Sequence, residues 1–163
     1  MAQVDVPHLV IRLPKVVSSI PEKHTLFYDW IEKLERGEVI RCAEDQIFSP
    51  IEAGDVADCV FGLLKIQENG TFHIGGPENL SRADLYDILI NEIGCIYPNN
   101  RPMVRCNIYD FDEVIEDRPI DCSLNSDRLK LALGERLKFN TMHDVCAEIR
   151  KKLYSRKINI ATN

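Results

Sequence analysis

Hydrophobic residues recur along this chain with two periods, one typical of short buried strands and one typical of helices. Residues 8–13 form a short run rich in aliphatic side chains that ends at Pro14, which predicts a strand of a parallel sheet. Residues 22–36 show helical spacing of their apolar positions, and Gly37 follows as a helix stop. The chain is therefore expected to begin with a strand and an amphipathic helix.

The middle of the chain predicts strands that alternate with helices. Short strands are expected at residues 39–42, 46–48 and 71–74. One helix is expected to start with Asp55 as its cap and to end near Lys65. The next starts at Ser81 in a capping-box pattern and stops at Gly94. This alternation is typical of the α/β class.

The last third of the chain is polar and irregular up to residue 121, with one strand expected at residues 103–108. Two further helices are expected to begin near Ser126 and Thr141, and the second to end near Ser155. Residues 1–155 are thus interpreted as a single substrate-binding-type α/β domain, and residues 156–163 as a flexible tail.

Composition narrows the class of protein. A chain of 163 residues with 45% hydrophobic content can bury the core of one domain. No stretch reaches the roughly 20 apolar residues of a membrane span, and the N-terminus lacks the pattern of a signal peptide. We therefore expect a cytoplasmic protein with no membrane partner.

Charge and cysteine spacing exclude two further classes of site. A net charge of −6 argues against a nucleic-acid partner, because phosphate neutralisation needs clustered Lys and Arg. The six cysteines are scattered without any Cys-x-x-Cys pair, which predicts reduced thiols and no metal site.

Several short motifs, in a fixed order, resemble the C-terminal half of extended short-chain dehydrogenases/reductases. They are Asp45-Gln46 with Ser49-Pro50-Ile51, Asp55, Phe72-His73-Ile74-Gly75-Gly76, Ser81, and Arg118-Pro119 ahead of Leu124. Among these enzymes the chain is similar to dTDP-4-dehydrorhamnose reductases and to NAD-dependent epimerases and dehydratases. The resemblance covers residues 9–136 and implies a partial Rossmann-like fold, in which short parallel strands pack against helices.

Two motifs of the complete family enzymes do not occur. The first glycine is Gly37, so no dinucleotide fingerprint precedes it, and Gly75-Gly76 are followed by Pro77 rather than by a third glycine in register. None of the five tyrosines has a lysine four places on. We therefore expect no catalytic residue here and no cofactor bound by this chain alone, while the resemblance implies NAD or NADP for the complete enzyme.

The resemblance also implies which residues bind substrate, a nucleotide-sugar or related small molecule: Gln46, Ser49, Pro50 and Arg118. Arg118 has the best physical case, because a guanidinium holds a diphosphate by two parallel hydrogen bonds. The alternative for Arg118 is an ion pair with a neighbouring carboxylate. Lys15 stands where reductases of this family tend to carry tryptophan, which leaves the identity of the sugar open.

Three functions follow from these patterns. The chain is the substrate-binding portion of an NAD(P)-dependent reductase and is incomplete as a catalyst on its own, or it is a non-catalytic regulatory module derived from that family, or it is an interaction domain. A parallel strand without upstream partners exposes an apolar edge. We therefore expect association, either with a Rossmann-type partner domain or as a homodimer.

Overall fold

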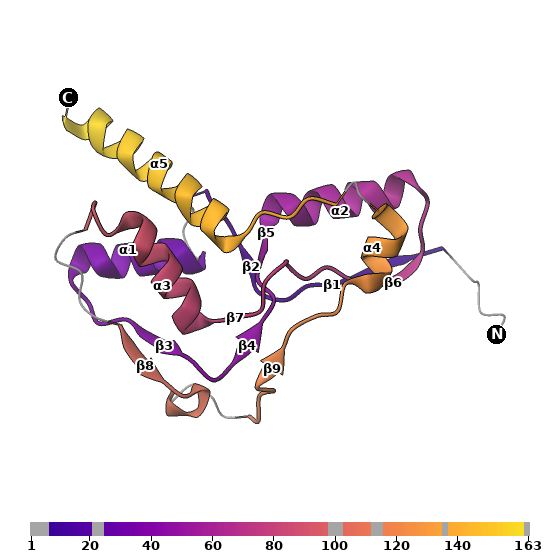
Figure 1. Ribbon diagram of the computed structural model, residues 1–163, viewed down its shortest axis with the longest axis horizontal. Helices are drawn as coiled ribbons and strands as arrows, with labels where there is room; N and C mark the ends of the chain where they lie inside the picture. The colour runs from indigo at the N-terminus through magenta and orange to yellow at the C-terminus, as the bar shows by residue number, and fades with distance from the viewer. Residues whose placement is uncertain (1–6, 21–24, 98–102, 112–115, 135–136, 162–163) are drawn as a thin grey trace.

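The computed structural model describes residues 7–20, 25–97, 103–111, 116–134 and 137–161, with side chains described as far as residue 156 (Figure 1). Strands and helices follow in the order β1 (Leu9–Arg12), β2 (Val16–Val17), α1 (Leu26–Arg36), β3 (Arg41–Ala43), β4 (Ile47–Phe48), β5 (Ile51–Glu52), α2 (Ala53–Lys65), β6 (Gly70–His73), β7 (Leu80–Ser81), α3 (Arg82–Ile93), β8 (Val104–Cys106), a 3-10 turn (Ile108–Asp110), β9 (Asp121–Cys122), α4 (Asp127–Leu133) and α5 (Met142–Ala161). The predicted α/β class is confirmed.

The strands form small sheets joined mainly by parallel pairing. β1 pairs with β6, β2 with β5, and β3 with β8, all in parallel, while β4 lies between antiparallel β7 and parallel β9. Parallel neighbours need long crossover connections, and the intervening helices supply them. Each pair therefore joins segments that are far apart in the sequence.

The pair of β1 and β6 is covered on one face. Leu9 and Ile11 pack against buried residues, whereas Val10 and Arg12 on the other face of β1 are exposed. Within the described part of the chain, β1 pairs with β6 alone, so its other edge is open. Parallel sheets are normally buried on both faces, which makes this strand unusual as a solvent-facing edge.

Two hydrophobic cores lie at opposite ends of the molecule (Figure 1). In the first, α1, α3 and α5 contribute side chains around Trp30, whose ring meets Phe27 and Tyr86 edge to face at centroid distances of 5.9 and 5.5 Å. The second lies between α2, α4 and the β1–β6 pair, and its buried members are Ile51, Cys59, Leu63, Phe72, Ile74, Leu129 and Leu133.

Several local predictions are confirmed. Gly37 ends α1 in the left-handed conformation, with φ 66°. Ser81 and Asp84 form the predicted capping box: the Asp84 amide donates to the Ser81 hydroxyl at 3.1 Å, and the Ser81 amide donates to the Asp84 carboxylate at 2.8 Å. Thr141 and Asp144 make the same exchange at the start of α5. Short-range sequence patterns thus predicted these helix ends correctly.

Asp55 was predicted to cap α2, and this prediction is wrong. The cap is Glu52, whose carboxylate accepts from the amides of Gly54 and Asp55. Asp55 is buried in the first turn and accepts from the backbone and side-chain nitrogens of Asn140 at 2.8 and 2.7 Å. Burial raises the pKa of its carboxyl. Asp55 therefore holds the segment before α5 against α2.

α5 continues to Ala161, beyond its predicted end near Ser155 and into the segment interpreted as a tail. The sequence after Ser155 contains no glycine or proline that would end a helix, which explains the extension. Among the described residues, no helix has both the length and the apolar content needed to cross a membrane.

Candidate functional site

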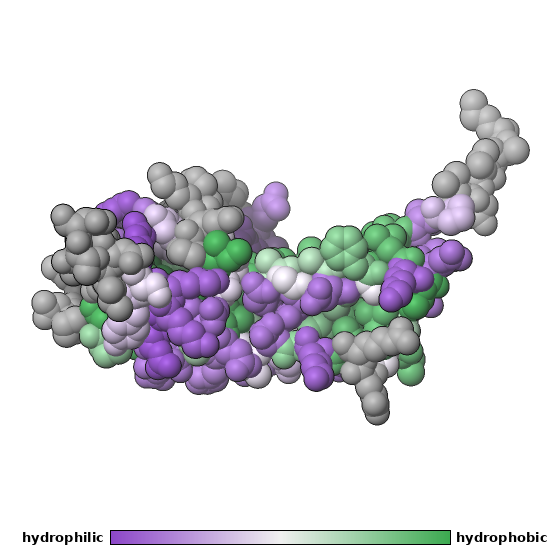
Figure 2. All heavy atoms as spheres, turned by 90° about the horizontal axis from the view of Figure 1, so that it is seen from above, coloured by the Kyte–Doolittle hydropathy of each residue, from purple (hydrophilic) through white to green (hydrophobic). Residues whose placement is uncertain are grey.

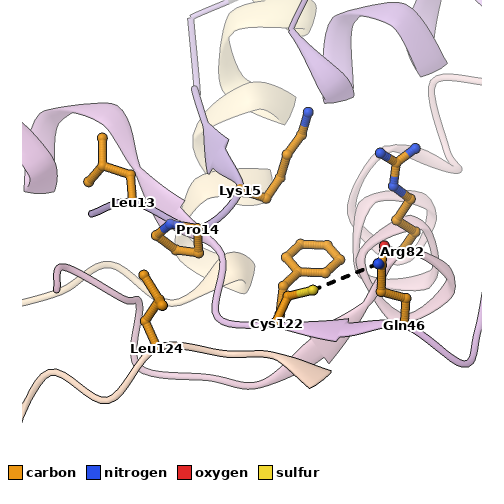
Figure 3. Close-up of a pocket in the computed structure, with 8 residues that line it drawn as sticks. Leu13, Pro14, Lys15, Gln46, Arg82, Cys122 and Leu124 are labelled. Atoms are coloured by element: carbon orange, nitrogen blue, oxygen red, sulfur yellow. Dashed lines mark hydrogen bonds between the residues drawn. The ribbon is translucent and has the colours of Figure 1, made fainter. Parts of the chain in front are cut away.

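A pocket of about 330 Å³ opens where β1 ends (Figure 3). Its walls come from four separate parts of the chain: Leu13, Pro14, Lys15, Gln46, Phe48, Arg82, Cys122 and Leu124. Open α/β sheets bind ligands outside the carboxyl ends of their strands, and this pocket occupies that position relative to β1. It is therefore the candidate binding site.

Each wall is positioned by a neighbouring element. Pro14 ends β1, and the Lys15 carbonyl accepts from the amide of Ile51 at 3.1 Å, just before β2 begins to pair with β5. Arg82 is the first residue of α3, directly after the capping serine. Figure 3 shows Lys15 and Arg82 extending on the same side of the pocket, with Leu13, Pro14 and Leu124 opposite.

Gln46 lies in this pocket, as one of the four residues predicted to bind substrate. Its side-chain nitrogen donates to the Pro119 carbonyl at 3.0 Å and lies 3.7 Å from the Cys122 sulfur. The Cys122 thiol donates to the same carbonyl at 3.3 Å. These contacts attach the segment before β9 to β4 and fix one rim of the pocket.

Ser49 and Pro50 lie outside the pocket lining, buried between β4 and β5. The Ser49 hydroxyl accepts from the Leu124 amide at 3.0 Å, and its carbonyl accepts from the Gly76 amide at 3.1 Å. These bonds hold backbone segments together, and the substrate-binding roles of the two residues stay predictions.

Arg118 is exposed and does not line the pocket. Its backbone carbonyl accepts from the Tyr109 hydroxyl at 3.2 Å. Within the described segments, no carboxylate lies within ion-pair distance of its guanidinium, so the alternative of a local ion pair is not seen. Its neighbour Pro119 bonds to Gln46, and a binding role for Arg118 stays a prediction.

Arg82 and Cys122 were not predicted as site residues, and Lys15 was noted only as a departure from the family pattern. The capping box located the start of α3 but carried no sign that this helix begins beside the end of β1. Only the long-range pairings of the strands bring Lys15 and Arg82 together.

Gly75 and Gly76 pack against the chain itself rather than forming a cradle for phosphate. A Cβ atom on Gly76 would lie 1.7 Å from the Pro50 carbonyl oxygen, and one on Gly75 would lie 2.9 Å from that of Leu124. Protein backbone therefore fills the space that a dinucleotide phosphate would need, and these glycines do not fit that group. In the described part of the chain, no three His, Cys, Asp or Glu side chains gather as metal ligands.

Comparison with known proteins identifies relatives of this architecture. The family model of the RmlD substrate binding domain matches residues 2–142. No curated protein is significantly similar to the chain.

Solved structures of similar fold include three enzymes. A dTDP-4-dehydrorhamnose reductase from Yersinia enterocolitica has a TM-score of 0.71 at 18% identity, and the match covers 88% of this chain and 49% of that one. The Bordetella bronchiseptica enzyme WbmH, in complex with NAD+, has a TM-score of 0.71 at 14% identity, covering 88% and 44%. WbmG from the same organism, in complex with NAD and UDP, has a TM-score of 0.66 at 17% identity, covering 92% and 46%. The chain thus spans about half the length of these structures.

Proposed function

This chain belongs to the RmlD substrate binding domain family, and we propose that it is the nucleotide-sugar-binding portion of an NAD(P)-dependent reductase of the dTDP-4-dehydrorhamnose reductase type. The observation that carries this proposal is the pocket at the carboxyl end of β1, where Gln46 and two cations face an apolar wall. A few polar groups in a mainly apolar concavity are typical of small-molecule sites.

Hydride transfer belongs to a part of the enzyme outside the pocket described above. The chain has neither a dinucleotide fingerprint nor a Tyr-x-x-x-Lys pair, and the space around Gly76 is filled by the Pro50 backbone. The cofactor supplies the hydride chemistry in such enzymes, and a protein contributes binding and orientation. The role proposed for this chain is therefore to hold the sugar nucleotide, with NAD or NADP bound by a cofactor half.

We expect calorimetric titration of the purified chain to show saturable binding of a dTDP-, UDP- or GDP-sugar and no saturable binding of NADH or NADPH. The pocket proposed to bind the sugar nucleotide is lined by residues of this chain, whereas the glycine fingerprint that cradles a dinucleotide does not occur in its sequence. Tight binding of NADH would contradict the proposal that the cofactor is bound by another part of the enzyme. Binding of neither sugar nucleotides nor dinucleotides would favour a regulatory or interaction module.

Exposed apolar side chains lie on both sides of the β1–β6 pair. Val10 on the outer face of β1 is 43% exposed, and Phe61 and Leu64 on α2 are 69% and 55% exposed. Seen from above, hydrophobic side chains gather over α2 (Figure 2). Solved relatives are about twice as long as this chain, and some bind NAD. We propose that the cofactor half of the enzyme adds its sheet to the open edge of β1 and covers these residues.

Sedimentation velocity of the purified chain tests this proposal by measuring its association. Without a cofactor half, the chain is expected to associate in an open-ended manner as its concentration rises, because an unpaired parallel edge accepts any strand. The variant F61K/L64K should associate less, and E68K, which makes the same change in charge at a half-buried position just after α2, serves as the control. A discrete dimer would identify a second copy as the occupant instead, and a strictly monomeric chain would overturn the proposal.

A further inference from the structure

The pocket at the end of β1 holds two positive charges that form no ion pair with a described carboxylate. Lys15 and Arg82 both line it (Figure 3), and neither lies within 4.0 Å of a carboxylate oxygen among the residues the structure describes. Some arginines do pair, since Arg36, Arg105 and Arg150 each form an ion pair. The two cations of the pocket belong to those that do not.

The two charges also disfavour each other. Partial burial lowers the pKa of Lys15, and the nearby Arg82 lowers it further, while Asp29 offsets only part of the effect. Like charges that share a poorly hydrated site raise the free energy of the charged state. An anion placed between them would relieve the repulsion, and its attraction to both cations would offset their partial desolvation. The two cations therefore make the pocket electrostatically favourable for an anionic group.

The rest of the lining restricts what carries that charge. Leu13, Pro14, Phe48 and Leu124 are apolar, and among the residues that the structure describes no Asp or Glu lines the pocket. A volume of about 330 Å³ is at the small end of ligand sites. The shape and chemistry fit a compact ring that contacts the apolar side and carries an anionic group toward Lys15 and Arg82.

We propose that Lys15 and Arg82 together bind one anionic group of the ligand, either a phosphate or a carboxylate on the sugar. This inference rests on the proposed function, because it assigns the ligand class of the same pocket. Arg82 would donate two parallel hydrogen bonds, and Lys15 would contribute a point charge. The pocket would then select acidic ligands over neutral ones of the same size.

The test compares K15Q, R82Q and the double variant with the unchanged chain, and K65Q on α2 is the charge-matched control. Titrations use UDP-glucose, UDP-glucuronate, UDP, inorganic pyrophosphate and glucuronate. Each single substitution is expected to weaken the anionic ligand about 10-fold and the double variant more, while K65Q leaves affinity unchanged. K15R should restore most of the affinity, and higher salt should weaken binding to the unchanged chain more than to the double variant.

The ligands separate the two sources of charge. Loss confined to UDP-glucuronate and glucuronate would identify a sugar carboxylate, and equal loss for UDP, UDP-glucose and pyrophosphate would identify phosphate. If sugar nucleotides bind but none of the variants changes their affinity, the inference is overturned and the proposed function stands. If no sugar nucleotide binds, and pyrophosphate binds only when both cations are present, the anion site stands and the proposed function fails. If no probe binds, both fail.

Discussion

Replacing Gly76 with alanine is expected to lower the free energy of unfolding by at least about 4 kcal/mol, or to prevent folding. The added Cβ atom would lie 1.7 Å from the Pro50 carbonyl oxygen and 2.8 Å from its carbon. Hydrogen bonds hold the backbone on both sides of Pro50 in place. The Gly76 amide donates to the Ser49 carbonyl, and the Ile51 amide donates to the Lys15 carbonyl. Urea denaturation, followed by circular dichroism, measures the loss.

G37A is the matched control for this substitution. Gly37 has φ 66°, so alanine there is strained, but nothing lies within 4 Å of the added Cβ atom. A cost of about 1 kcal/mol is expected from the left-handed backbone alone. Equal losses for G37A and G76A would show that the contact with Pro50 is not a tight one.

Replacing Phe72 with alanine is expected to lower the free energy of unfolding by about 3–5 kcal/mol, because it leaves a cavity in the second core. Phe72 is 1% exposed, and the Arg128 guanidinium lies 4.2 Å from the centre of its ring. The Arg128 side chain also donates to the carbonyls of Thr71 and Asn69, both at 3.0 Å. Loss of the ring therefore also removes the surface on which Arg128 rests.

The same variant tests whether residues 1–155 form one domain. Trp30 is the single tryptophan of the chain and lies in the first core, so its fluorescence reports on the core that is left intact. If the two cores unfold together, F72A shifts the fluorescence transition as far as the circular dichroism transition. An unmoved Trp30 transition would mean two separate units. L131A is the control, since Leu131 is 87% exposed and its truncation should cost under about 0.5 kcal/mol.

The sequence was most informative where a structure depends on neighbours along the chain. Ser81 with Asp84, and Gly37 after an apolar helix face, carry their own geometry within a few residues. The prediction for Asp55 was wrong because it used only the neighbouring sequence. Its position suggests a helix cap, while its actual partner, Asn140, lies 85 residues further along. Nothing local to Asp55 signals that contact.

The candidate site depends even more on distant segments. Gln46 was identified through the order of family motifs, yet its hydrogen-bond partner Pro119 lies 73 residues away. Arg82 looked like the first residue of a capped helix and nothing more. Its proximity to Lys15 follows from how β2 joins β5 and how β7 joins β4, which no hydrophobic period encodes. The order of the motifs thus identified the region of the site, whereas the presence of both Lys15 and Arg82 in it depends on the long-range pairing of the strands.

The parallel pairing of β1 with β6 also governs when the fold can form. Arg12 in β1 meets His73 across 61 residues, so this contact cannot exist before the intervening segment has been synthesised and ordered. Contacts of such large sequence separation slow the search for the native state. During that delay, β1 lacks the pairing with β6 and is open to strands of other nascent chains. If β1 paired early with the sheet of an already folded partner domain, its edge would be exposed for a shorter time. Folding of the chain and its assembly with that partner would then occur in the same step.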